Sequence, residues 1–207
     1  MRAPSTVARS LAGLTALVAL LSLVLQFVLL MPAGSDPGGV GSAAWRFLGY
    51  FTVLSNIGVA IVCVARASGD AGGVAGPGPR AAVALYIAIT GLVYVLLLRT
   101  LWHPQGLQWW ADIGLHYAVP VLYLLGWVLG EHGGLHWRQL LLALLVPVVY
   151  LAWALLLGQR TGQYPYPFLD WPVLGWKGFL GNVATMALAF TAFGALLWKV
   201  DQSMSRR

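Results

Sequence analysis

Two side chains in this sequence, Thr52 and His116, have the chemical types of a nucleophile and its base. Thr52 lies in the apolar stretch "FTVLSNIG" (51–58), and His116 lies in "WWADIGLHYAVP" (109–120). A hydroxyl group is a weak nucleophile until a neighbouring base takes its proton, and an imidazole suits this task. If folding brings the two together, we expect Thr52 to attack an ester carbonyl while His116 accepts its proton.

The neighbours of His116 on its own helix favour this interpretation. Asp112 precedes it by four residues and shares its helical face, where a carboxylate is placed to hold one ring nitrogen. Pro120 follows by four residues, and because proline has no N–H, the carbonyl group of His116 loses its usual helical partner. A histidine within an apolar helix is a functional candidate by default. The alternative is a histidine that only joins two helices through a hydrogen bond.

Further polar groups accompany Thr52. Thr52, Ser55 and Asn56 are spaced i, i+3 and i+4, so they share one helical face. Ser55 is therefore a competing nucleophile. Asn56 is a candidate donor to the oxyanion that forms on an attacked carbonyl, as is Asn182 in the last apolar run. Alternatively, threonine and serine in membrane helices often bond only to the preceding turn or to a neighbouring helix.

The phrase "YPYPFLD" (164–170) places a stiff aromatic corner between two apolar runs. Its two prolines exclude a regular helix. We expect Tyr166 and its neighbours to form a lid over a lipid-sized cavity, with Asp170 in the polar network beneath it. A purely structural turn is the alternative. Arg99, at the end of another apolar run, is expected to snorkel, to bind a lipid carboxylate or to pair with Asp112.

The elements that position these residues are apolar helices. Of the 207 residues, 59% are hydrophobic and 9% are charged, and the mean hydropathy is +0.79. A soluble domain carries roughly 25% charged residues. Stretches long enough to cross a bilayer as helices lie at about 11–31, 47–65, 81–98, 113–130, 139–158 and 178–198. We therefore predict an all-α fold, an integral membrane bundle of six transmembrane helices over residues 1–207, with no soluble domain.

The positions of the basic residues predict the topology. With the amino terminus inside, the inner side collects Arg2, Arg9, Arg66, Arg80, Arg138, Lys199, Arg206 and Arg207, and the outer side keeps Arg46, Arg99, Arg160 and Lys177. Because positive residues favour the cytoplasmic side, this asymmetry places both termini in the cytoplasm. We expect a multi-pass protein of the cell membrane. The basic residues form no stripe, so we expect no nucleic-acid partner.

With this topology, three polar side chains reach the same half of the membrane. Thr52, His116 and Asn182 each lie four to six residues beyond a charged residue at the outer end of their helix. At ~1.5 Å per residue, this places them at a similar depth of roughly 6–9 Å. The "YPYPFLD" corner covers the same side, so the sequence predicts one polar site built from three helices and a loop.

Three of these stretches together resemble a known family. The segments "GYFTVLSN" (49–56), "WWADIGLHYAVP" (109–120) and "GQYPYPFLD" (162–170) are similar to the androgen-induced-gene (AIG/FAR-type) family of six-helix membrane proteins, in its bacterial branch. Mammalian members hydrolyse fatty-acid esters of hydroxy fatty acids with an intramembrane threonine and histidine. The resemblance implies that Thr52 is the nucleophile and His116 its base. One departure is Phe51, which stands where the family pattern has leucine.

A protein without catalytic activity and a metal site are two further possibilities that the sequence raises. A non-catalytic lipid-binding or transport-accessory membrane protein would use the same polar cavity without chemistry, and a membrane lipid or lipid ester is the partner in either case. The segment "EHGGLH" (131–136) brings two histidines near a glutamate, but its paired glycines break the helix that would aim them at one ion. We expect no metal and no cofactor. The single Cys63 is expected to pack as a small apolar residue.

Overall fold

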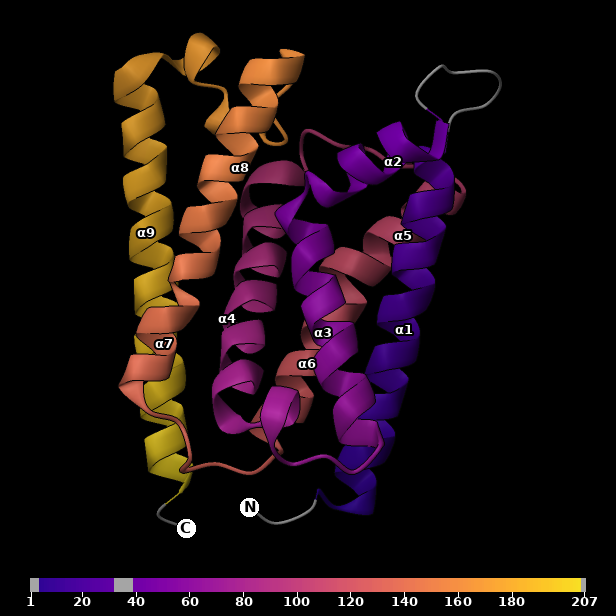
Figure 1. Cartoon of the computed structure of the whole chain (residues 1–207), viewed down its shortest axis with the longest axis vertical. Coiled ribbons are helices and arrows are strands. Elements are labelled where there is room, and N and C mark those ends of the chain that lie inside the picture. Colours follow the sequence, from indigo (N-terminus) through magenta and orange to yellow (C-terminus); the bar gives the residue numbers. More distant parts are fainter. Residues whose placement is uncertain (1–3, 32–38, 206–207) are drawn as a thin grey trace.

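The molecule consists of helices, most of which run along its long axis (Figure 1). A computed structural model describes residues 4–31 and 39–205, and no strand occurs within these two ranges. The prediction of an all-α fold is confirmed. The α-helices are α1 (Thr6–Leu30), α2 (Gly39–Leu48), α3 (Phe51–Ala67), α4 (Pro77–Val93), α5 (Leu107–Ile113), α6 (Val119–Val128), α7 (Trp137–Ala143), α8 (Leu145–Thr161) and α9 (Trp171–Met204). Short 3-10 turns lie at Gly73–Ala75 and Pro167–Leu169, and π-helical turns at Tyr94–Leu98 and Gly114–Ala118.

Five helical segments of the described chain are long and apolar enough to cross a membrane, and the bent pair α2–α3 would make a sixth. The five segments are Thr6–Leu30, Pro77–Leu98, Leu107–Val128, Trp137–Thr161 and Trp171–Met204. Four of them consist of shorter helices or turns in direct succession: a π-helical turn or a local irregularity interrupts three, and a kink at Gly175 divides Trp171–Met204. Five of the six predicted apolar runs correspond to these segments, and the run 47–65 falls on the bent pair.

Helices α1 and α4 begin earlier than the predicted apolar runs, each because of the residue at its start. The Ser5 hydroxyl accepts the N–H of Ala8 at 3.2 Å, so α1 starts at Thr6 and not near residue 11. Pro77 opens α4 at a position where proline fits without losing a hydrogen bond. Hydrophobicity alone does not report such ends, since a capped first turn also carries polar residues.

The second predicted helix, 47–65, is wrong as a single straight element. The chain forms α2 (Gly39–Leu48), which lies at 86° to α3 and occupies part of a segment that the sequence suggested was only a connection. At the bend, a side chain on Gly49 would approach Leu157 Cδ2 to 2.9 Å and the Arg46 carbonyl oxygen to 3.0 Å, so the turn needs a glycine there. The Tyr150 hydroxyl donates to the freed Gly49 carbonyl at 2.9 Å. Thr52 therefore lies in the first turn of α3.

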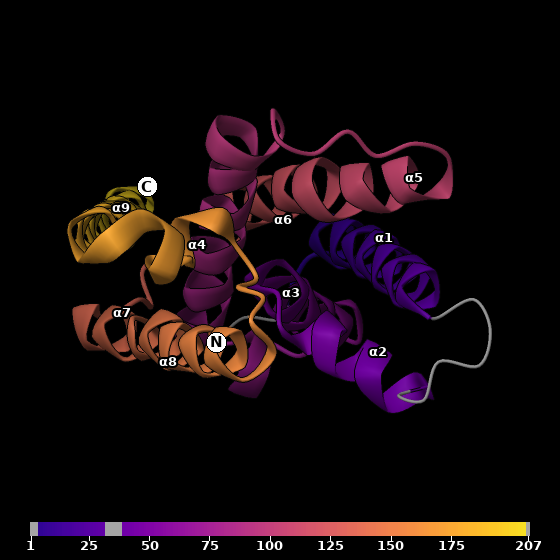
Figure 2. The same cartoon turned by 90° about the horizontal axis from the view of Figure 1, so that it is seen from above.

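Helix α4 is central, and its neighbours form two groups around it (Figure 2). On one side, α1 packs against α3 through buried small residues, among them Ala12, Ala16 and Ala19. On the other side stand α8 and α9, and α9 contacts α4. The α8–α9 side is the less densely packed part, and the main cavity lies there.

Helix α1 begins and α9 ends at the same end of the bundle (Figure 1). Arg9, Arg66, Arg80 and Lys199 lie in helical turns at or near that end. Arg2, Arg206 and Arg207, which contribute to the predicted charge asymmetry, lie outside the described residues. The assignment of this end to the cytoplasm stays a prediction.

Candidate active site at the start of helix α3

The break before α3 leaves the N–H of Thr52 without a partner within its helix, as in any first helical turn. The Tyr166 hydroxyl accepts this N–H at 3.3 Å, and the same hydroxyl lies 3.4 Å from Thr52 Oγ1. Both side chains are buried. The aromatic corner therefore contacts the candidate nucleophile directly, through two atoms of one residue.

Thr52 also meets His116. Its Oγ1 lies 3.3 Å from His116 Nε2, within hydrogen-bonding distance. The two residues come from α3 and from the π-helical turn Gly114–Ala118. Thr52 and His116 are 64 positions apart in the sequence, and the fold brings them together. This is the geometry that a hydroxyl nucleophile and its base require.

Two acceptors fix the orientation of the His116 ring. Its Nδ1 lies 3.2 Å from Asp112 Oδ1 and 3.2 Å from the Asp112 backbone carbonyl oxygen. Because both partners only accept hydrogen bonds, Nδ1 carries the hydrogen of the neutral ring, and Nε2 turns its lone pair toward Thr52. The buried Asp112, predicted to hold one ring nitrogen, is thus adjacent to His116 and sets its tautomer.

Tyr94 completes this arrangement and was not singled out from the sequence. Its hydroxyl donates to Asp112 Oδ2, and its ring stacks on that of His116 with 4.0 Å between centroids and 16° between planes. Tyr94 is buried in the π-helical turn that Arg99 follows. The signal in the sequence is a phenol within a mostly aliphatic run, where a hydroxyl needs a partner.

Both Tyr94 and His116 belong to π-helical turns, Tyr94–Leu98 and Gly114–Ala118. Pro120 follows the second turn and has no N–H to give to the carbonyl of His116. The missing N–H of Pro120 is thus accompanied by a π-helical turn around His116, in which one extra residue is inserted into the helix. Such π turns in helices frequently accompany functional sites.

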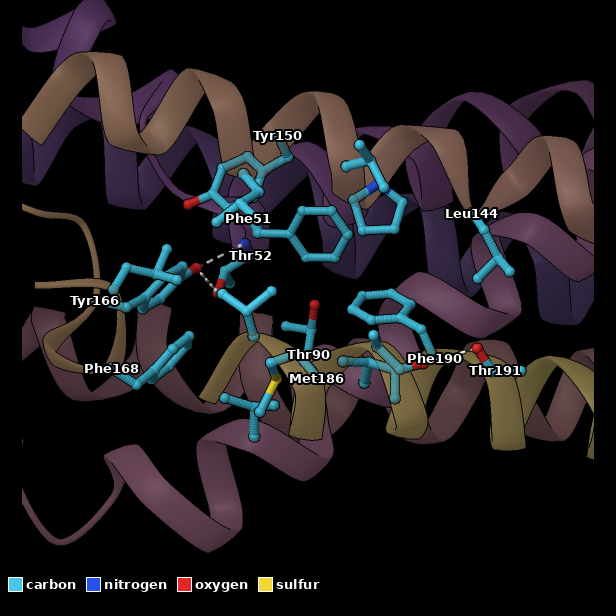
Figure 3. A pocket seen from close by; sticks show the side chains of 18 of the residues that line it. Phe51, Thr52, Thr90, Leu144, Tyr150, Tyr166, Phe168, Met186, Phe190 and Thr191 are labelled. Atoms are coloured by element: carbon cyan, nitrogen blue, oxygen red, sulfur yellow. Dashed lines mark hydrogen bonds between the residues drawn. The ribbon is translucent and has the colours of Figure 1, made fainter. Parts of the chain in front are cut away.

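An apolar cavity of about 280 Å³ reaches Thr52 (Figure 3). Thr52 and Tyr166 stand toward one end, and Leu144 and Thr191 stand toward the other. Its lining comprises Phe51, Thr52, Ile89, Thr90, Val93, Leu98, Leu144, Pro147, Val148, Tyr150, Leu151, Tyr166, Phe168, Leu169, Val183, Met186, Ala187, Phe190 and Thr191. His116 does not belong to the lining. Thr52 therefore stands between the cavity and the histidine, and the cavity suits a hydrocarbon chain.

The aromatic corner forms one wall of this cavity. Tyr166 stacks on Phe168 with centroids 5.0 Å apart and planes 5° apart, and both rings line the cavity. Burial raises the pKa of the Tyr166 hydroxyl, and the hydrogen bonds with Thr52 only partly oppose this. The hydroxyl therefore keeps its proton at neutral pH. The Tyr166 hydroxyl accepts the Thr52 N–H and still has its own hydrogen to donate.

The other hydroxyl on this face of α3, Ser55, has different partners. Ser55 Oγ donates to the Thr52 carbonyl at 3.0 Å and lies 2.9 Å from Thr90 Oγ1. Asn56 Nδ2 donates to the carbonyls of Thr52 at 2.8 Å and Leu115 at 3.2 Å. Neither residue lines the cavity. Their amide and hydroxyl donors secure the start of α3 beside the His116 helix.

Two further predicted site residues, Asn182 and Asp170, stabilise the loop and the start of α9, and a third, Arg99, does not. Asn182 Nδ2 donates to the Phe168 carbonyl at 3.1 Å and so fixes the corner to α9. Asp170 caps α9 by accepting the N–H of Val173 at 3.4 Å. Arg99 is exposed and forms no ion pair with Asp112. Asn182 does not line the cavity that reaches Thr52, so an oxyanion role does not fit its position.

Within residues 4–31 and 39–205, no three His, Cys, Asp or Glu side chains gather as a metal site would require. No family model matches the chain, and neither a curated protein nor a solved structure is significantly similar to it. The resemblance to the androgen-induced-gene family therefore stays a prediction from the three sequence stretches.

Proposed function

We propose that this chain is an integral membrane hydrolase of lipid esters, with Thr52 as nucleophile and His116 as base. The observation that supports this most is the 3.3 Å approach of Thr52 Oγ1 to His116 Nε2 at the wall of an apolar cavity of about 280 Å³. The hydroxyl thus has a base on one side and room for an acyl chain on the other. The family resemblance supports the same reaction and a fatty-acid ester as substrate.

In the proposed reaction, His116 Nε2 takes the hydroxyl proton of Thr52 while Oγ1 attacks the ester carbonyl carbon. The Asp112 carboxylate stabilises the imidazolium that forms. His116 then gives the proton to the leaving alcohol, which leaves an acyl-threonine. A water molecule activated by His116 hydrolyses this intermediate and restores Thr52.

Tyr166 is the proposed donor to the oxyanion. Its hydroxyl lies 3.4 Å from the attacking oxygen and retains its own hydrogen while it accepts the Thr52 N–H. Asn56 and Asn182, the donors suggested by the sequence, use their amide groups on backbone carbonyls. A single removed donor of this kind costs about 10²–10³ in kcat in well-studied hydrolases.

The membrane setting follows from the same proposal. Six crossings, five long segments and the bent α2–α3 pair, would put the start of α1 and the end of α9 on one side of the membrane, and the basic residues favour the cytoplasmic side of a cell-membrane protein. The substrate, a membrane lipid ester, would enter between α8, α9 and α4, whose residues line the cavity. The apolar character of this lining also fits the second candidate, a lipid-binding protein without chemistry.

An assay of the purified protein in detergent separates the two candidates. We expect hydrolysis of a fatty-acid ester of a hydroxy fatty acid by the unaltered protein, and less than about one thousandth of that rate in Thr52→Ala and in His116→Ala. The double variant should be scarcely worse, because a nucleophile and its base act as one unit. Binding of the intact ester without hydrolysis would favour the lipid-binding candidate.

A further inference from the structure

A second polar cluster lies at the opposite end of α3. Arg66 is in the last turn of α3 and Thr52 in its first, so the helix separates the two by roughly 20 Å. Arg80, near the start of α4, joins Arg66 there, and both arginines are buried, with 6% and 5% of their surfaces exposed. Buried arginines need acceptors for several N–H groups each, and an unmet donor is costly.

One carboxylate serves both guanidinium groups. Glu131 Oε2 accepts from Arg66 Nη2 at 2.8 Å and from Arg80 Nη1 at 3.2 Å, and the Glu131 backbone carbonyl lies 3.3 Å from Arg80 Nη1. Nη2 of Arg80 is buried and has no hydrogen-bond partner in residues 4–31 and 39–205. The guanidinium groups of Arg66 and Arg80 thus share the carboxylate of Glu131, and the hydrogens on Arg80 Nη2 have no acceptor among the described residues.

A second buried carboxylate at this end, Asp201, is occupied elsewhere. Its Oδ1 lies 3.3 Å from His132 Nδ1, and its Oδ2 accepts the Leu135 N–H at 3.1 Å. Gln202 Nε2 also lies 3.4 Å from Oδ2. Asp201 therefore does not supply the acceptor that Arg80 lacks.

A small cavity of about 20 Å³ lies beside the two arginines, between α1, α3, α4 and α6. Its lining is Ala8, Leu11, Ala12, Thr15, Cys63, Arg66, Arg80, Tyr123, Gly126 and Trp127. The Thr15 hydroxyl donates to the Leu11 carbonyl at 2.8 Å, and the Tyr123 hydroxyl donates to the Arg80 carbonyl at 3.0 Å. Both hydroxyl groups of the lining are thus engaged, the guanidinium groups are its charged donors, and its volume holds one atom of the size of oxygen.

We propose that this cavity is an anion-binding site, which receives one oxygen of a phosphate group on Arg66 and Arg80. Arginine is the side chain best suited to phosphate, because its planar group presents several donors at once. The phosphate of a lipid headgroup and free phosphate share this chemistry. The site lies where α3 ends and α4 begins, which is the depth of a headgroup if these helices cross a bilayer. This inference does not depend on the reaction proposed for Thr52.

Thermal unfolding of the full chain in a neutral detergent tests the site. We expect dioctanoyl phosphatidylglycerol at about ten times its Kd to raise Tm by roughly 3 °C, while dioctanoylglycerol, which lacks the phosphate, leaves Tm unchanged. Inorganic phosphate is compared with sodium chloride at equal ionic strength. Stabilisation by the lipid alone assigns the site to a headgroup, and stabilisation by phosphate assigns it to the free ion as well.

A variant that fills the cavity shows whether the effect arises there. Ala8 is half-buried and lines the cavity, so a larger side chain there should fill it. We expect Ala8→Leu to raise the Kd for the stabilising ligand at least tenfold while the arginines and Glu131 stay intact. Ala65→Leu is the matched control, because Ala65 is also half-buried but does not line the cavity. If no phosphate compound stabilises the protein, or if Ala8→Leu responds like Ala65→Leu, the proposal is overturned and water is the occupant.

Discussion

His116 stacks on Tyr94, with the two ring centroids 4.0 Å apart, while the Tyr94 hydroxyl donates to the carboxylate of Asp112. Asp112 in turn holds His116 Nδ1 at 3.2 Å. The three side chains form a closed arrangement in which each fixes another. As a result, the orientation of the His116 ring is fixed, and its Nε2 faces Thr52.

This arrangement predicts that Tyr94 positions the base. Tyr94→Phe keeps the stacked ring and removes only the hydrogen bond to Asp112. We expect kcat for ester hydrolysis to fall by about 10-fold, with KM unchanged, because a loosened base affects the chemical step and not the binding of the acyl chain. Steady-state kinetics over a range of ester concentrations measure both constants. Tyr86→Phe is the control, since the Tyr86 hydroxyl donates to the Ala143 carbonyl away from the site.

Tyr166 is predicted to act through its hydroxyl. Tyr166→Phe keeps the stacking on Phe168 and should lower kcat by about 10²-fold, as the loss of one oxyanion donor does. Tyr150→Phe removes another buried hydroxyl of the same cavity, one that donates to the Gly49 carbonyl. That variant should lose about 1 kcal/mol of stability and keep most of its kcat. Equal loss of kcat in both variants would remove the oxyanion role from Tyr166.

The length of the cavity predicts a preference for long acyl chains. Thr191 stands toward the end away from Tyr166 (Figure 3), so Thr191→Trp should shorten the space available to the chain. We expect hydrolysis of long-chain esters to fall by at least 10-fold relative to short-chain esters. Thr185→Trp is the matched control: Thr185 is likewise exposed on α9 and likewise donates to the carbonyl four residues before it, but it does not line the cavity. An unchanged ratio in Thr191→Trp would mean that the acyl chain binds elsewhere.

The ion pairs of Glu131 with Arg66 and Arg80 predict that the protein loses stability in acid. Partial burial by itself raises its pKa, but the hydrogen bond from Arg66 and the charges of Arg66 and Arg80 outweigh this, so the pKa of Glu131 lies below its usual value. A group whose pKa is lower in the folded state stabilises the fold above its unfolded pKa and loses this contribution as the pH falls through its folded pKa. Tm should therefore fall between about pH 5 and pH 3. In Glu131→Gln this part of the decline should be absent, and an identical decline would contradict the assignment.

Most of the helical segments could be predicted from the sequence, because an apolar run of about twenty residues has few alternatives to a helix. The pairing of Thr52 with His116 also followed from residue types. The bend at Gly49 did not, because the close approach of the Leu157 side chain to Gly49 is a tertiary contact, which no local pattern records. The sequence also suggested Asn56 and Asn182 as oxyanion donors, whereas both amides donate to backbone carbonyls and neither residue lines the cavity.

The most direct test of the account is the site of covalent labelling. A fluorophosphonate probe traps a nucleophile that a base has activated, and mass spectrometry of the digested protein identifies the modified residue. We predict an adduct on Thr52 that disappears in His116→Ala and persists in Ser55→Ala, since Ser55 contacts Thr90 and not the histidine. An adduct on Ser55, or ester hydrolysis that continues in a folded Thr52→Ala variant, would contradict the central claim.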